Sequence, residues 1–416
     1  MSRLPLRALV AASGISSAGV TMTLIAIPWF VLQSTGSGTK TGLVTAAEVL
    51  GLMLAAMLGG PIVDRVGTRR ASVGADLLTT VTVLLIPLAV GTTGLGLPGL
   101  IALSFVMGVS RGPADTAKQV LLAGVAELGG IRTSRAASAV EAAMRTGRMV
   151  GAPAAGALIA LIGPIPVLFV DAGALLLSAA LVFAVIPAAA GPPRSSSGGY
   201  LAELREGLGF LKRDAVLRAI VGMLMLTSCL DFGLIGVLYP AYGDQVLHSA
   251  ALIGAMITAV AVGALLGSAL YAWAGHRFSR RSAILAAVAI VGAPRFALLA
   301  LEPAPVVLLA GLVVTGIGAG AMNPILLPVV YERVPEAFRG RVLSLLVGGV
   351  LAATPLGSMA AGLLLDGIGL VGALTAFGGL YLIATTFPVI FRVWRGLDDP
   401  APVGGDRPVS QGARTD

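Results

Sequence analysis

Long apolar segments run through almost the whole chain, and short polar or glycine- and proline-rich stretches separate them. The segments lie at residues 8–33, 41–63, 71–91, 97–120, 138–162, 166–188, 216–240, 250–274, 282–301, 304–328, 342–365 and 369–391. Each is close to the ~20 residues that an α-helix needs to cross the hydrocarbon core of a bilayer. The pattern therefore predicts an all-α membrane protein with twelve transmembrane helices.

The longest polar break, at residues 189–215, divides these helices into two sets of six. Basic turns at residues 64–70 and 275–281 occupy equivalent places in the two sets, which is typical of two parallel six-helix repeats. We predict two pseudo-symmetric bundles, at residues 1–188 and 216–391. Within the 189–215 linker, leucines at helical spacing (Leu201, Leu204, Leu208, Leu211) favour an amphipathic helix on the membrane, or a solvated linker helix. Residues 392–416 form a tail rich in proline, glycine and charge, for which we predict disorder.

The composition excludes a water-soluble enzyme and most cofactor chemistry. Apolar residues make up 56% of the chain and charged residues 12%, with a mean hydropathy of +0.95. So few charges cannot cover a soluble surface. The single cysteine, Cys229, rules out an intrachain disulfide, and His248 and His276 lie far apart, so neither a metal nor another cofactor is expected.

The basic residues predict the orientation. Of the 28 Lys and Arg residues, 23 fall in alternate loops and the two terminal segments, and only Lys40 falls in the opposite loops. Because cytoplasmic loops are enriched in Lys and Arg, both termini are predicted to be cytoplasmic in a multi-pass protein of the cell membrane. The same loops account for the net charge of +8, so no nucleic-acid partner is expected.

The turn after the second predicted helix carries a motif that resembles the signature of the major facilitator superfamily, G-x-x-x-D-R-x-G-x-[RK]-[RK]. Its matching residues are Gly60, Asp64, Arg65, Gly67, Arg69 and Arg70. The resemblance implies that Asp64 faces the positive N-terminus of helix 11, near Arg341, and helps to hold the outward-open state. It also implies that Asp115 is the partner of Arg69. Thr68 stands where many members carry a base, which makes the charge relay thinner.

Two weaker likenesses point to exporters of this superfamily. Predicted helix 5 is similar to the glycine- and proline-rich motif of drug/proton antiporters at Gly147, Gly151, Pro153 and Gly156, although Ala152 and Ala157 break the core of that motif. Close helix packing through small residues explains the same pattern equally well. The stretch at 332–342 resembles the helix 10–11 loop of bacterial macrolide and siderophore exporters.

Charged residues inside predicted helices are the candidates for the transport site, because a charge in hydrocarbon costs about 2.5–3.5 kcal/mol or more. The family resemblance places helices 1, 4, 7 and 10 around a central cavity, which favours Arg111 and Asp231 as site residues. Arg148 is expected near mid-membrane. Glu48, on helix 2, is intermediate between the cavity residues and those that serve packing. Arg111 with Asp115, and Glu141 with Arg145, are spaced for pairing on one helix face. Asp76, Asp171 and Arg295 are expected to serve packing.

Asp231 is the first candidate for a proton carrier in a cavity shared with Arg111 or Arg148, and Glu48 is the second. The alternative for Asp231 is a helix-terminal acid already solvated from outside. Helix 1 has no acid, which weakens a proton-coupling scheme.

Together these features predict a secondary transporter, not an enzyme, since no phosphate-binding loop of the ATPase type occurs. We expect a monomer that exports a small amphipathic drug or metabolite in exchange for protons. Proton-coupled uptake of a nutrient, and a transporter-like sensor that moves nothing, remain the alternatives.

Overall fold

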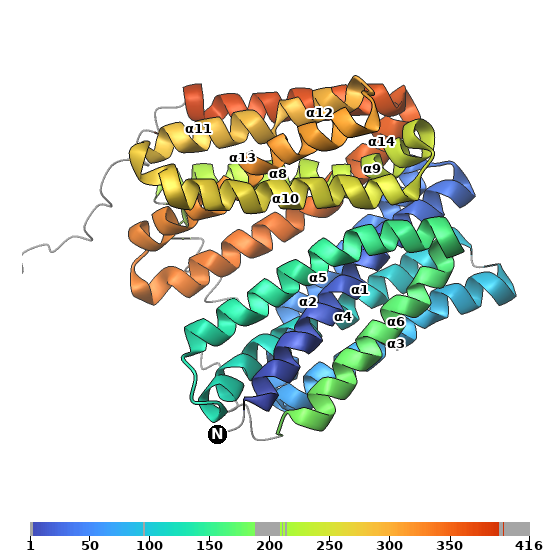
Figure 1. The fold of residues 1–416 in the computed structure, drawn as a ribbon, viewed down its shortest axis with the longest axis vertical. Helices are drawn as coiled ribbons and strands as arrows, with labels where there is room; N and C mark the ends of the chain where they lie inside the picture. Colours follow the sequence, from blue (N-terminus) through green and yellow to red (C-terminus); the bar gives the residue numbers. More distant parts are fainter. Residues whose placement is uncertain are drawn as a thin grey trace, which may run out of the picture.

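The computed structural model describes residues 3–94, 96–187, 209, 211, 212, 214–390 and 394. Every regular element in this part of the chain is a helix. An apolar chain in a bilayer must satisfy its backbone hydrogen bonds internally, and a helix does so within one segment. Figure 1 shows two bundles side by side, the first coloured blue to green and the second yellow to red.

The first bundle has six long helices joined by short turns. They are α1 (Leu4–Thr35), α2 (Gly38–Val66), α3 (Thr68–Thr93), α4 (Leu97–Leu128), α5 (Thr133–Ile162) and α6 (Pro164–Val185). Their bounds confirm the first six predicted segments, but α4 continues eight residues beyond the predicted end at 120. Lys118, one of the 23 basic residues assigned to the loops and termini, lies inside this helix and is buried, so that assignment is wrong for this residue.

The second bundle contains the helices of the C-terminal half. They are α8 (Ala215–Gly233), η1 (Leu234–Leu238), α9 (Tyr239–Tyr242), η2 (Gly243–Leu247), α10 (Ala250–Ala274), η3 (Gly275–Arg277), α11 (Arg280–Val291), α12 (Ala293–Ala300), α13 (Pro305–Arg333) and α14 (Glu336–Ile390). The run from α8 to η2 is one continuous rod, so it corresponds to a single predicted span. The α11–α12 pair corresponds to another.

The last two predicted spans lie within α14, which turns at Gly369. Gly369 has a φ of 74°, a conformation that glycine adopts without steric cost. Among the described residues, nine helices are long and apolar enough to cross a membrane, with α14 counted once. The helices α2 and α5, with 29 and 30 residues, also exceed the ~20 residues required. The predicted amphipathic helix and disordered tail fall largely outside the described residues.

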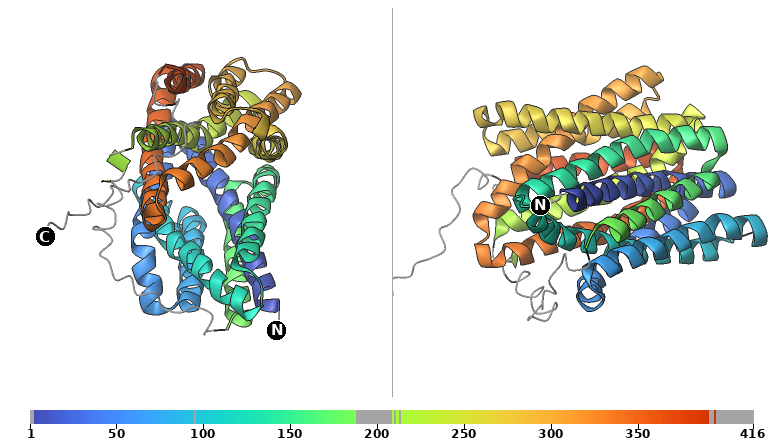
Figure 2. Two further views of the ribbon diagram at one scale, coloured as in Figure 1. Left: turned by 90° about the vertical axis from the view of Figure 1, so that its left-hand side faces the viewer. Right: turned by 60° about the horizontal axis from the view of Figure 1, so that its bottom comes forward.

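Different turns lie at the two ends of the molecule. One end, which we call the basic end, carries the N-terminus and the α2–α3, α4–α5 and α10–α11 turns (Figures 1 and 2). The opposite end, which we call the far end, carries the α1–α2 and α5–α6 turns and the bend at Gly369.

The two bundles contact each other through α2 with α14 and through α5 with α10. Glycines make these contacts close, because a methyl group at Gly42 would overlap the carbonyl oxygen of Ser358. A methyl group at Gly254 would likewise overlap that of Ala152. Gly42 follows the α1–α2 turn and Gly254 lies in the first turns of α10, so this packing brings the bundles together toward the far end.

Candidate functional site

A cavity of about 400 Å³ lies between α1, α4 and α5 in the first bundle. It is lined by hydroxyl groups (Ser13, Ser16, Ser17, Thr21), by charged groups (Asp115, Lys118, Glu141, Arg148) and by apolar groups (Val20, Leu24, Leu122, Val140, Met144). Such a lining offers hydrogen bonds, charge of both signs and apolar surface to one small molecule.

Helix α5 carries a charged face whose side chains are exposed. Arg145 Nε donates to Glu141 Oε1 at 2.8 Å, and Arg148 Nη2 lies 3.9 Å from the same oxygen. The pairing of Glu141 with Arg145 is confirmed. The Arg148 side chain, which the sequence places near mid-membrane, is 53% exposed because it forms part of the cavity wall.

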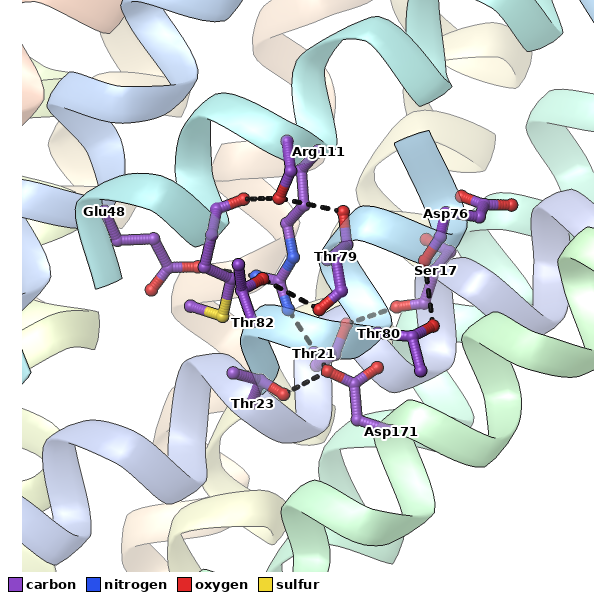
Figure 3. A network of polar contacts seen from close by, with 12 residues as sticks. Ser17, Thr21, Thr23, Glu48, Asp76, Thr79, Thr80, Thr82, Arg111 and Asp171 are labelled. Carbon is purple, nitrogen blue, oxygen red and sulfur yellow. Dashed lines mark hydrogen bonds and ion pairs between the residues drawn. The ribbon is translucent and has the colours of Figure 1, made fainter. Parts of the chain in front are cut away.

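The most buried charges of the first bundle gather around Arg111 of α4. Arg111 Nη1 donates to Glu48 Oε1 of α2 at 2.5 Å, and Nη2 donates to Asp171 Oδ2 of α6 at 3.1 Å. Thr23 of α1 also donates to Asp171, and Figure 3 shows the Arg111 side chain between the two carboxylates. We call Glu48, Arg111 and Asp171 the Arg111 cluster. All three residues are buried.

One sequence prediction about these residues is wrong, and a second is extended. Arg111 does not pair with Asp115 on its own helix but with acids from two other helices. Asp171, assigned to packing, is a direct partner of Arg111, and one of its oxygens, Oδ1, is buried without a hydrogen bond. The signal that could have found Asp171 is its place inside a predicted span, because intramembrane charges seek partners.

Small residues let the helices around this cluster approach each other. A methyl group at Gly108 of α4 would overlap the Glu48 carbonyl oxygen, and one at Gly51 of α2 would overlap that of Phe105. A methyl group at Gly19 of α1 would overlap the Asp171 carboxylate. The sequence thus places its glycines where α1, α2 and α4 close around the charges.

A second buried pair lies deeper toward the basic end. Lys118 of α4 lies 3.0 Å from Asp76 of α3, and Ser178 of α6 donates to Asp76 at 2.9 Å. Within ion-pairing distance, Lys118 has one carboxylate partner, that of Asp76. Its contacts join α3, α4 and α6.

In the second bundle, Asp231 of α8 is paired with Arg295 of α12. Arg295 is buried, whereas the Asp231 side chain is 34% exposed. Asp231 does not line the cavity that Arg148 lines, and its ion-pair partner comes from its own bundle rather than being Arg111 or Arg148. Arg295, expected to serve packing, is that partner. One acid pairs with one base here.

The basic turn between α2 and α3 is only partly described. The side chain of Asp64 lies outside the described residues; the backbone from Gly60 to Arg65 is the last part of α2, and Gly67 has a φ of 88°. Arg69 donates to the Phe183 carbonyl of α6, and its guanidinium lies 4.8 Å from the Phe183 ring centroid. Arg69 thus has a different partner from Asp115, which lines the cavity. Arg65 and Arg70 are exposed.

The glycines of α5 lie at helix contacts. Gly147 and Gly151 face the α1 backbone at Gly14 and Ala18, while Gly156 and Pro153 approach the start of α10. This geometry is what the packing interpretation of the motif requires. Among the described residues there is also no group of three His, Cys, Asp or Glu side chains that could hold a metal ion.

Comparison with known proteins identifies a matching family model and similar relatives. The family model described as Major Facilitator Superfamily matches residues 9–229 and 221–414. The chain is 31% identical over 399 residues to the multidrug efflux pump Tap of Mycolicibacterium fortuitum, covering 95% of this chain and 97% of that protein. It is 32% identical over 401 residues to the multidrug efflux pump Tap of Mycobacterium tuberculosis (strain ATCC 25618 / H37Rv), covering 95% of each.

Solved structures share the fold at low identity. The nucleoside transporter NupG matches with a TM-score of 0.75 at 11% identity, over 94% of this chain and 98% of that one. A bacterial homologue of the human lysosomal transporter Spinster, in an inward-facing and unoccupied conformation, matches with a TM-score of 0.73 at 14% identity, over 93% and 97%.

Proposed function

Because the chain belongs to the major facilitator superfamily, we propose that it exports small amphipathic drugs or metabolites by alternating access, in exchange for protons. The multidrug efflux pumps that it resembles along 95% of its length support this substrate class and direction. The function is transport rather than catalysis. The protein acts as a monomer in the cell membrane.

The basic end faces the cytoplasm in this proposal, and both termini lie there. The distribution of Lys and Arg among the loops supports this orientation. The tight packing near the far end then closes the outer side, and the cavity between α1, α4 and α5 takes substrate from the cytoplasm or the inner leaflet. Its mixed apolar and hydroxyl lining suits an amphipathic molecule.

The observation that carries the coupling proposal is the charge balance of the Arg111 cluster. Arg111 lies between two buried carboxylates, whereas Lys118 and Arg295 each pair with one. An uncompensated charge in a low-dielectric site is costly, so a cluster with one carboxylate too many favours a bound proton. We assign the exchangeable proton to Glu48 or Asp171. This cluster replaces Asp231 as first candidate.

Transport in inverted membrane vesicles tests the proposal. Vesicles containing the protein are supplied with a fluorescent amphipathic cation or a macrolide, and an inward-acid gradient is imposed. Wild-type protein should accumulate substrate until a protonophore collapses the gradient. Glu48→Gln and Asp171→Asn should bind substrate but lose gradient-driven accumulation. A matched control is Glu302→Gln, which removes a carboxylate from the α12–α13 turn, outside the Arg111 cluster and outside the Lys118–Asp76 and Asp231–Arg295 pairs.

The outcomes separate the alternatives. If the vesicles accumulate substrate only when the outside is acid, substrate and protons move in the same direction, and the function is uptake instead of export. A protein that binds the probes but never accumulates them, in any variant, is a sensor. Full gradient-driven transport by both Glu48→Gln and Asp171→Asn contradicts the assignment of the proton to the Arg111 cluster.

A further inference from the structure

The α1–α2 turn and α14 meet at the far end through a single carboxylate. Asp366 of α14 accepts hydrogen bonds from the Ser37 hydroxyl at 2.8 Å, from the Gly38 backbone N–H at 2.6 Å and from the Thr39 backbone N–H at 2.9 Å. Ser37 is the N-cap residue of α2, in the first bundle, whereas Asp366 belongs to the second. These bonds therefore cross between the two bundles.

The chemistry of this contact is that of a capped helix N-terminus. The first N–H groups of a helix have no partner within the helix, and the helix dipole makes that end positive. A carboxylate that accepts two of these N–H groups and a hydroxyl makes charge-assisted hydrogen bonds, which are shorter and stronger than neutral ones. The α2 N-terminus obtains this partner only while the bundles are closed at the far end.

Glycine backbone brings the carboxylate into reach. A methyl group at Gly38 would lie 2.6 Å from the Leu365 side chain, and one at Gly362 would overlap the Gly38 carbonyl oxygen. Helices α2 and α14 thus touch backbone to backbone beside Asp366. Any motion that opens the far end must separate them and break all three hydrogen bonds together.

We propose that Asp366 is a gating residue, a latch that holds the far end closed and is released each time that end opens. Asp64, which the family resemblance places against the start of helix 11, lies at the other end of the same helix pair. At 1.5 Å per residue, the stretch of α2 from Gly38 to Asp64 spans about 39 Å, close to the ~40–45 Å thickness of a whole bilayer. The resemblance thus implies a second carboxylate-to-N-terminus contact at the basic end of this helix pair, opposite the one that Asp366 makes at the far end.

The proposal extends the alternating-access function, and its test needs no substrate. Thr45 of α2 is 4% exposed and packs against Gly236 of η1 across the closed far end. A cysteine at this position becomes reactive when the far end opens. In a Cys229→Ala background, the Thr45→Cys protein is reconstituted in lipid nanodiscs, where both faces are accessible, and its rate of reaction with a hydrophilic maleimide is measured.

Asp366→Asn should raise that reaction rate on the order of tenfold, because the Asn side chain cannot present two charged acceptor oxygens to the α2 N-terminus. Asp366→Glu should recover part of the slow rate. Asp244→Asn, which removes another carboxylate in η2 at the far end, should leave it unchanged. An equal rate for Asp366→Asn and its parent overturns the latch.

If Asp366→Asn does not give a monodisperse protein, Ser37→Ala carries the test. It removes one of the three donors and leaves both backbone N–H groups, so a rise of about two- to threefold is expected, and no rise overturns the proposal. A wild-type protein that transports nothing would contradict the proposed function but leave the labelling result intact. The two failures are therefore distinguishable.

Discussion

Arg111 is the residue on which two buried carboxylates of the first bundle, those of Glu48 and Asp171, depend. Its guanidinium joins α4 to α2 through Glu48 and to α6 through Asp171, and Thr23 adds α1. Burying a guanidinium between carboxylates costs free energy, but removing it from the folded protein costs more, since the acids are left without a partner. The ionisation state of this cluster therefore affects how these four helices pack.

We predict that Arg111→Met destabilises the folded protein by about 3–5 kcal/mol, because two buried carboxylates lose their cation. The midpoint of denaturant-induced unfolding in detergent micelles measures the loss. Adding Glu48→Gln and Asp171→Asn to Arg111→Met should restore much of the stability, because no unpaired charge then remains. An unchanged midpoint for Arg111→Met would show that the cluster does not contribute to the fold.

At the scale of elements, the glycines of α4 set the distance between helices. Gly108 has the Glu48 carbonyl oxygen where a side chain would begin, so α2 and α4 are in backbone contact beside the Arg111 cluster. Membrane helices associate by such close packing because lipid offers no hydrophobic driving force between them. The position of Glu48 therefore depends on a residue that has no side chain.

Gly108→Ala should destabilise the protein by about 1–3 kcal/mol and weaken transport, because the added methyl group forces α2 away from α4. Gly74→Ala is the matched control, since Gly74 of α3 is exposed and a methyl group added there would meet no atom within 4 Å. Alanine is the better helix former, so the control should be neutral or slightly stabilising. Thermal unfolding followed by the fluorescence of a thiol-reactive or aromatic probe compares the two, and equal midpoints would argue against the close contact.

At the scale of the whole molecule, orientation follows from the basic turns, and each fusion site reports on one end. A reporter fused after Asp416 should be active only in the cytoplasm, and a reporter inserted at Thr93 should be active only outside. The physical reason is that the Arg-rich turns resist translocation. The reverse pattern of activities would invert the assignment of the cavity to the cytoplasmic side.

The two ends of the α2–α14 pair should act in opposition. Asp64→Asn should lower the maleimide reaction rate of Thr45→Cys, because it weakens the contact expected when the basic end is closed. Asp366→Asn should raise the same rate. Combining both substitutions should return the rate toward that of the parent, provided that each acts on the same two-state equilibrium. A double variant with the rate of Asp366→Asn alone would show that Asp64 has no part in that equilibrium.

The sequence by itself determined the helices and their grouping into two bundles. The apolar segments have a length set by bilayer thickness, so their count and approximate bounds follow from residue order alone. The bounds were missed where a helix continues beyond its apolar segment, as α4 does from 120 to 128. The residues Glu48, Arg111 and Asp231 were also identifiable, since charges inside spans are rare.

Only the tertiary structure decided which charge meets which. Spacing along one helix suggested Arg111 with Asp115, but Arg111 reaches Glu48 and Asp171, which are 63 and 60 positions away in the chain. Arg295 likewise lies 64 positions from Asp231, and Asp366 more than 320 from the α2 N-terminus. Local periodicity reports which face of a helix a residue occupies. It carries no information about which other helix packs on that face, because this is set by backbone contacts such as those of Gly51, Gly108 and Gly362 between segments far apart in the chain.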